Sequence, residues 1–90
     1  MAVEPIPREE LDRAVRALCR QVASDIIRMM GETDTSFAQM AVKLGVTEKT
    51  VRGWVDDLMD GIEGKTTMRV IAEMCWAMDC VPQFNATKKP

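Results

Sequence analysis

A glycine at position 45 separates two short stretches of helical periodicity, and this pair limits the chain to a small set of folds. The first stretch opens with the pattern of a capping box, Ser36 with Gln39 three residues later, and its apolar residues recur at spacings of three and four. These apolar residues are Phe37, Met40, Ala41 and Leu44. Because glycine tolerates the left-handed backbone conformation that ends many helices, we expect Gly45 to stop the first helix sharply.

The second stretch begins almost at once. Thr47 is expected to cap it, and an apolar stripe at i, i+3, i+4 and i+7 follows. The stripe consists of Val51, Trp54, Val55 and Leu58. Only Val46 and Thr47 link the two helices, and small or turn-forming residues at 41 and 45 let them cross closely at a steep angle. The sequence therefore predicts a helix-turn-helix unit over about residues 36–58.

Two further helices are expected, one on each side of this unit. Pro7 suits the first turn of the first helix, and Gly31 is a plausible end for it. The apolar residues of this helix are Leu11, Val15, Leu18, Val22, Ile26 and Met29. Thr66 or Thr67 can cap the last helix, which is expected to run to about Asp79. Its apolar residues, from Met68 to Met78, go nearly all round, as in a helix that is central to a core or shared with a partner.

The chain of 90 residues is long enough for one hydrophobic core and too short for two. The predicted fold class is all-α: a compact four- to five-helix domain over residues 8–81, with a long N-terminal helix. Residues 1–7 are expected to form an N-terminal tail. Residues 82–90 are expected to form a short extended tail, for which a solubilising role is the simpler reading and a DNA-contacting arm through Lys88 and Lys89 the other.

Composition argues against several functional classes. No apolar run approaches the roughly 20 residues of a membrane span, and the first residues are neither basic nor apolar, so we expect a cytoplasmic protein. The chain has no histidine, no phosphate-binding glycine loop and no nucleophile placed beside a base, which indicates that it is not an enzyme and uses no cofactor. Its three cysteines, Cys19, Cys75 and Cys80, form no Cys-x-x-Cys pair, so no metal site is expected.

The central stretch resembles a known family. It reads Phe37-Ala-Gln-Met-Ala-Val-Lys-Leu-Gly-Val-Thr-Glu-Lys-Thr-Val-Arg-Gly-Trp54 and is similar to the lambda-repressor and Cro-like helix-turn-helix proteins, the XRE family. The segment from Thr66 to Met78 looks like the next core helix of that family, and the resemblance covers roughly residues 26–81. It implies a lambda-repressor-like fold and a DNA-binding transcriptional regulator of bacterial or phage type. The expected partner is double-stranded DNA, bound by a repressor that acts as a homodimer.

The resemblance also implies roles for individual residues. Base contacts fall on Thr47, Glu48, Lys49, Thr50 and Arg52, where lysine or arginine could donate to guanine and glutamate could accept from cytosine. Phosphate contacts fall on Ser36, Gln39, Lys65 and Thr66. The core of the helix-turn-helix unit is expected to consist of Phe37, Ala41, Leu44, Gly45, Val46, Val51 and Trp54.

Three features depart from the family pattern. Phe37 stands where the family often has glutamine, and Gly53 leaves a frequent reading position without a side chain. Acidic residues follow where a phosphate-facing loop is expected: Asp56, Asp57, Asp60 and Glu63. The net charge is -2, whereas nucleic-acid binders usually carry a basic excess.

These departures keep a second function open. The alternative is a protein-binding adaptor, such as an anti-repressor, an antitoxin-like protein or a phage accessory protein, which keeps the fold and uses its acidic and Met-rich surfaces. The leading part of the first helix, from Leu11 to Leu18, has two readings as well. It is either a dimerisation extension, which we favour, or a longer cover for the core.

Overall fold

The structure, a computed structural model, describes residues 5–90, and this part of the chain folds into four α-helices without a strand. They are α1 (Arg8–Glu32), α2 (Phe37–Leu44), α3 (Glu48–Met59) and α4 (Met68–Ala77). The predicted all-α class is confirmed, with four helices rather than five. Residues 1–4 of the expected N-terminal tail lie outside the described residues, and residues 80–90 form no regular structure.

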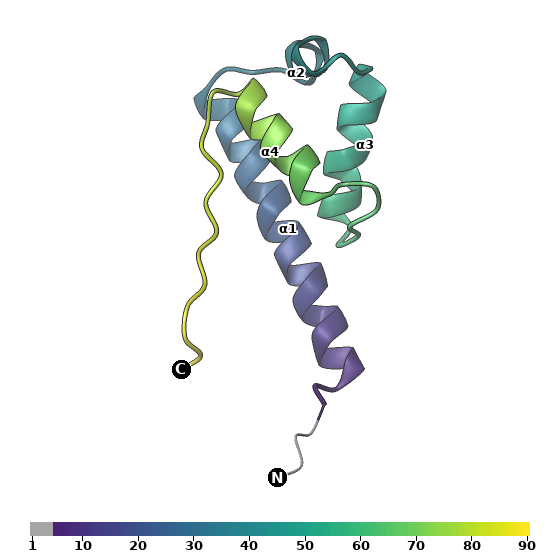
Figure 1. The fold of residues 1–90 in the computed structure, drawn as a ribbon, viewed down its shortest axis with the longest axis vertical. Helices are drawn as coiled ribbons and strands as arrows, with labels where there is room; N and C mark the ends of the chain where they lie inside the picture. Colours follow the sequence, from purple (N-terminus) through teal and green to yellow (C-terminus); the bar gives the residue numbers. More distant parts are fainter. Residues whose placement is uncertain (1–4) are drawn as a thin grey trace.

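The helices surround one core at one end of a long rod. In Figure 1, α1 forms the rod, α3 lies beside its upper half, α2 crosses the top, and α4 rises from the loop after α3 to the top, where the tail begins. Helix α1 packs on α3, and α2 packs on both α3 and α4. The principal extents are 53 × 23 × 18 Å, because the first turns of α1 and the C-terminal tail extend beyond the packed helices.

All four helices end in the same way. One residue adopts a left-handed conformation, and the next backbone N–H donates to the carbonyl five residues back, as in a Schellman motif. After α2 the left-handed residue is Gly45, with the Val46 amide 3.0 Å from the Ala41 oxygen. After α3 it is Gly61, at a φ of 79°. These two stops lie where the sequence places its glycines.

The other two left-handed residues are aspartates, Asp34 after α1 and Asp79 after α4. The expected stop at Gly31 is wrong, because α1 continues through that glycine to Glu32. The amide of Thr35 then donates to the Met30 oxygen at 2.9 Å, which closes the motif around Asp34. Aspartate can take this role because its short polar side chain tolerates the left-handed region better than most residues do.

The N-terminal ends follow the sequence signals closely. Ser36 and Gln39 form the predicted capping box, since the Ser36 Oγ accepts from the Gln39 amide and the Gln39 Oε1 accepts from the Ser36 amide. Thr47 caps α3 and Thr67 caps α4, each accepting from the amide three residues later. Pro7 precedes α1 without a side-chain cap.

The core contains residues from all four helices. Its buried members are Cys19, Ala23, Ile26, Met40, Ala41, Val51, Val55, Leu58, Met74, Ala77 and Met78. Four residues of the predicted helix-turn-helix core, Phe37, Leu44, Val46 and Trp54, are half-buried against this cluster. Helix α4 is not covered all round, because Met68 and Trp76 are 89% and 69% exposed. No helix within residues 5–90 has the apolar length that a bilayer crossing requires.

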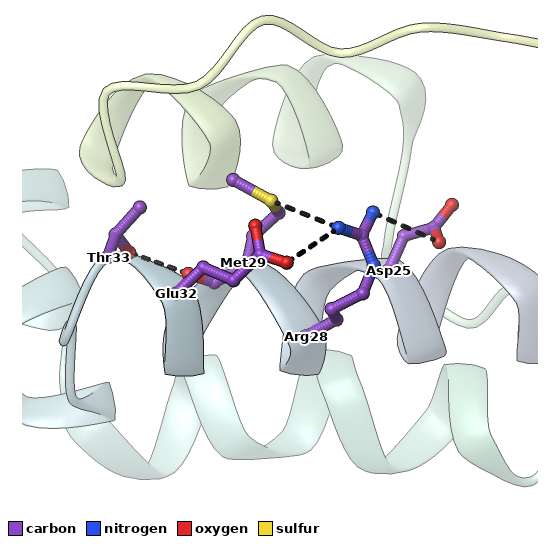
Figure 2. Close-up of polar contacts among 5 residues, drawn as sticks. All are labelled: Asp25, Arg28, Met29, Glu32 and Thr33. Carbon is purple, nitrogen blue, oxygen red and sulfur yellow. Dashed lines mark hydrogen bonds and ion pairs between the residues drawn. The ribbon is translucent and has the colours of Figure 1, made fainter.

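A groove of about 470 Å³ lies between α1, α4 and the first part of the C-terminal tail. Val22, Ile26 and Met29 line one side, and Ile71 and Cys75 line the other. Figure 2 shows the polar rim at the end of α1. There Arg28 reaches both Asp25, at 3.6 Å, and Glu32, at 3.1 Å, and the Thr33 hydroxyl donates to the Met29 carbonyl oxygen at 2.7 Å.

Candidate nucleic-acid interface

The link between α2 and α3 fixes how the second helix leaves the first. Gly45 has a φ of 69°, and a Cβ at this position would meet nothing within 4 Å. Glycine is therefore needed here for its backbone conformation and not for space. Figure 1 shows α2 nearly end-on while α3 lies in the plane of the view, so the two helices cross steeply. The first turn of α3 projects from the surface beside α2.

The five residues expected to contact bases are all exposed, and all lie at or just after the start of α3. Two of them, Thr47 and Thr50, are already paired: their hydroxyl oxygens lie 2.8 Å apart, and the Thr47 oxygen also accepts from the Thr50 amide. The hydroxyls of the free protein therefore serve the helix cap. Their methyl groups make no polar contact.

Arg52 is held in place by two neighbours. Its Nη2 lies 2.8 Å from the Glu48 Oε1, and its guanidinium carbon lies 4.7 Å from the centre of the Phe37 ring. The ion pair joins two turns of α3, and the cation–π contact joins α3 to the start of α2. Phe37, which departs from the family pattern, thus has a defined role as a platform for Arg52.

This arrangement affects what Arg52 can do. Exposed i, i+4 ion pairs contribute only about 0.3–0.5 kcal/mol, so a stronger acceptor can displace Glu48 at small cost. The i, i+4 spacing of Glu48 and Arg52 could have indicated the pair from the sequence. The contact with Phe37 could not be anticipated, because it depends on how α2 and α3 cross.

Lys49 differs from Arg52 in being free. It is exposed and takes part in none of the ion pairs found among residues 5–90. Its helical face also includes Gly53, Asp56 and Asp60, which follow at spacings of four, seven and eleven. The outer face of α3 therefore changes from basic at its start to acidic at its end.

The residues expected on phosphate fall into two groups. Ser36 and Gln39 sit at the start of α2, where the capping box occupies one oxygen of each side chain. The Gln39 side-chain amide nitrogen and the unpaired amides of the first turn remain donors. Lys65 is exposed in the loop between α3 and α4.

Thr66 requires a correction. It is 6% exposed, and its hydroxyl donates to the Trp54 carbonyl oxygen at 3.4 Å. A side chain below the surface cannot reach a phosphate, so we assign Thr66 to the attachment of the loop to α3. The sequence did not indicate this role, because Thr66 stands next to Thr67, which caps α4, and either threonine could have been the cap.

The acidic residues do not all point outward. Asp56, Asp60 and Glu63 are exposed, whereas Asp57 is half-buried. A Cβ at Gly64 would lie 2.6 Å from the Asp57 Oδ2, so this carboxylate lies against the loop backbone. Three of the four acids therefore contribute to a negative surface at the far end of α3.

Lys43 has a structural role that sequence reasoning missed. Its Nζ donates to the Ala77 carbonyl oxygen at 2.8 Å, which ties the last turn of α2 to the end of α4. The helix C-terminus favours a cation at this place. No sequence signal pairs two residues that are so far apart in the chain.

No metal-binding group was found in the described part of the chain. All three cysteines are free thiols. Burial raises the pKa of the Cys75 thiol, and the nearby Cys80 raises it further. Cys75 is therefore protonated at neutral pH and is a weak nucleophile.

The chain matches no family model, no curated protein and no solved structure.

Proposed function

We propose that this protein is a sequence-specific DNA-binding transcriptional regulator of bacterial or phage type. It would act as a homodimeric repressor of lambda-repressor-like fold, with α2 and α3 as its helix-turn-helix unit. The observation that supports this best is the exposed start of α3, which presents a free lysine, Lys49, one turn before Arg52, whose guanidinium lies over Phe37 at the capped N-terminus of α2. Such a pair of helices can place one helix across the phosphate backbone and the other in the major groove.

The residues have distinct tasks in this proposal. The amides of the first turn of α2, with Gln39, hold a phosphate and orient the protein. Lys49 donates to guanine, and Arg52 does the same once its ion pair with Glu48 has broken. Phe37 keeps the guanidinium of Arg52 close to the groove while the contact forms. Each good base contact is worth about 1–3 kcal/mol of discrimination.

The second candidate is the protein-binding adaptor. It is favoured by Asp56 and Asp60, which share a helical face with Lys49, and by the net charge of -2. Near phosphates these carboxylates would weaken binding, whereas a basic partner surface would attract them. An adaptor would use the acidic end of α3 and would not need Lys49.

A binding titration separates the two candidates. Fluorescence anisotropy would measure the affinity of the purified protein for DNA from upstream of its own gene and for random DNA, over a series of salt concentrations. Lys49→Ala and Arg52→Ala should each weaken binding to the upstream DNA by about tenfold or more, as expected for loss of a base contact. Arg28→Ala, which removes an equal charge from α1, is the matched control and should leave the affinity nearly unchanged.

The salt series tests the mode of binding. A DNA-binding protein should lose affinity steeply as salt rises. Weak and equal binding to both DNAs, unchanged by Lys49→Ala, would contradict the proposal and favour the adaptor.

A further inference from the structure

Two of the three cysteines lie at the same helix end. The Schellman motif that ends α4 has Asp79 as its left-handed residue, and the Cys80 amide donates to the Cys75 carbonyl oxygen at 2.8 Å. The side chains of the two residues joined by this hydrogen bond are commonly in contact in such motifs. The corresponding positions at the other three helix ends hold no cysteine. The end of α4 therefore brings two thiols together.

The hydrogen bond also limits the distance between the two Cα atoms. With standard backbone bond lengths, an amide nitrogen 2.8 Å from the carbonyl oxygen keeps the Cα atoms of Cys75 and Cys80 within about 6.7 Å of each other. Disulfide bonds join residues whose Cα atoms are about 4.4–6.8 Å apart. The backbone at the end of α4 thus already has a spacing that a disulfide can bridge.

The side chains agree with this spacing. Cys75 and Cys80 are both half-buried, and both line the groove between α1, α4 and the tail. The nearby Cys80 adds to the effect of burial in raising the pKa of the Cys75 thiol, so the two sulfurs lie close enough to interact. The Cys80 thiol donates only to the Met78 carbonyl oxygen, at 3.4 Å, which is a weak hydrogen bond that a disulfide would replace at small cost.

We propose that Cys75 and Cys80 are a site of reversible oxidation, at which a small-molecule disulfide such as oxidised glutathione converts the two thiols into an intramolecular disulfide. The site goes beyond the proposed function and does not rest on it, since the reaction is measured without DNA. Cys19 takes no part, because it is 6% exposed within the core cluster.

The reaction proceeds by two thiol–disulfide exchanges. One cysteine thiolate attacks a sulfur of oxidised glutathione, which forms a mixed disulfide and releases one glutathione thiolate. The other cysteine thiolate then attacks the protein sulfur of the mixed disulfide, closes the Cys75–Cys80 bond and releases the second glutathione thiolate. The two cysteines lose two electrons to the oxidant, and their two protons pass to the released thiolates. Excess reduced glutathione reverses both steps.

The bond would change how the tail is attached. Cys80 is the first residue of the irregular C-terminal segment, and Val81, Pro82 and Gln83 follow it along the groove. A bond to Cys75 holds the start of this segment against α4 even when the hydrogen bonds of the cap open. Oxidation therefore fixes one wall of the groove, and reduction frees it again.

A redox titration tests the proposal. The full chain is equilibrated with mixtures of reduced and oxidised glutathione, once folded and once in concentrated urea, and the remaining thiols are alkylated. Trypsin then releases residues 70–88, which contain Cys75 and Cys80 but not Cys19. Mass spectrometry distinguishes the doubly alkylated peptide from the disulfide peptide, which carries no alkyl group and is two hydrogens lighter than the dithiol.

The folded chain should need less oxidant than the unfolded chain. The ratio of oxidised glutathione to the square of reduced glutathione at half-oxidation should be lower by about tenfold or more when the chain is folded, because the fold already holds the two ends of the loop together. Cys19→Ala should behave like the unmodified chain. Cys75→Ser should form only a mixed disulfide with glutathione on Cys80. Circular dichroism would verify that each variant is folded.

A matched pair of variants tests whether the cap brings the thiols together. Asp79→Val places a β-branched residue at a φ of 57°, which weakens the cap, and it should reduce the difference between folded and unfolded chains several-fold. Asp34→Val makes the same change at a φ of 53° after α1 and should leave the difference unchanged. Equal effects of the two variants would overturn the role of the cap.

Two other results would overturn the site itself. One is a folded chain that needs as much oxidant as the chain in urea. The other is a folded chain whose main products are disulfides between chains, disulfides with Cys19 or mixed disulfides with glutathione. The anisotropy titration judges the proposed function separately, so either proposal can fail while the other stands.

Discussion

Two aspartates, Asp34 and Asp79, occupy backbone conformations that glycine adopts more easily. Their φ angles are 53° and 57°, and each follows the end of a helix. The left-handed conformation costs an L-residue about 1–2 kcal/mol, with aspartate among the more tolerant types. A carboxylate near a helix C-terminus is also disfavoured by the helix dipole. Both positions therefore hold residues that are not optimal for stability.

Asp34→Gly and Asp79→Gly should each stabilise the fold by about 0.5–1 kcal/mol, after allowance for the greater freedom of glycine in the unfolded chain. Thermal unfolding would show a rise of a few degrees in Tm for each change in a chain of this length. Gly45→Asp, which makes the opposite change at a φ of 69°, should lower the Tm. A fall in Tm for Asp34→Gly or Asp79→Gly would contradict this account of the helix ends.

Thr66→Val tests whether this residue attaches the loop to α3. Valine keeps the shape of threonine and removes the hydroxyl that donates to Trp54. The unfolding free energy should fall by about 0.5–1 kcal/mol, as for loss of one neutral hydrogen bond. Affinity for DNA, measured by the same anisotropy titration, should not change. A clear loss of affinity with unchanged stability would return Thr66 to the phosphate-contacting set.

Among the helices, the sequence predicts the spans far better than the contacts between them. Periodicity and caps such as Ser36 and Thr47 are local signals, and the structure confirms the helices that they predict. The covered side of α1 could not be predicted, because Leu11 has the same periodicity as the core residue Ile26. Only the position of α3 and α4 decides which of the two is buried.

For the candidate site too, local features could be predicted from the sequence, whereas contacts between elements could not. The exposure of Lys49 could be predicted, because the apolar stripe of α3 lies on the opposite side of the helix and is buried in the core. The position of Arg52 over Phe37 depends on the crossing of α2 and α3, for which the sequence contains only the turn. The burial of Thr66 likewise depends on how the loop returns to α3.

Lys43→Met should reveal how α2 and α4 are joined. The change keeps most of the side-chain length and removes the charged donor to the Ala77 oxygen. We expect the unfolding free energy in urea to fall by about 1–2 kcal/mol, toward the lower side of the range for a charge-assisted hydrogen bond because the lysine is partly exposed. Lys65→Met is the matched control and should have little effect, since Lys65 is exposed in a loop. Equal effects from both lysines would argue against a specific link between the helices.

For the molecule as a whole, the elongated shape divides the chain into a packed end and a free end. The packed end contains the buried cluster, and the free end consists of the first turns of α1 and the tail. Local stability should follow this division, because backbone hydrogen bonds without tertiary cover open easily.

Hydrogen exchange would measure this difference. The amides of residues 11–14 should exchange almost as fast as in a short peptide, because every residue from Arg8 to Ala14 is exposed, whereas those around the buried Ile26 should be protected. Equal protection of the two segments would show that the first turns of α1 are stable without tertiary contacts.

The arrangement of the two chain ends has a practical consequence. The start of α1 and Pro90 lie toward the same end of the molecule, whereas α2 and its junction with α3 lie at the other (Figure 1). A dye, an affinity tag or a surface linker at Pro90 would therefore stay clear of the exposed start of α3. The protein can be immobilised through its tail on a sensor with its candidate reading surface facing the solution.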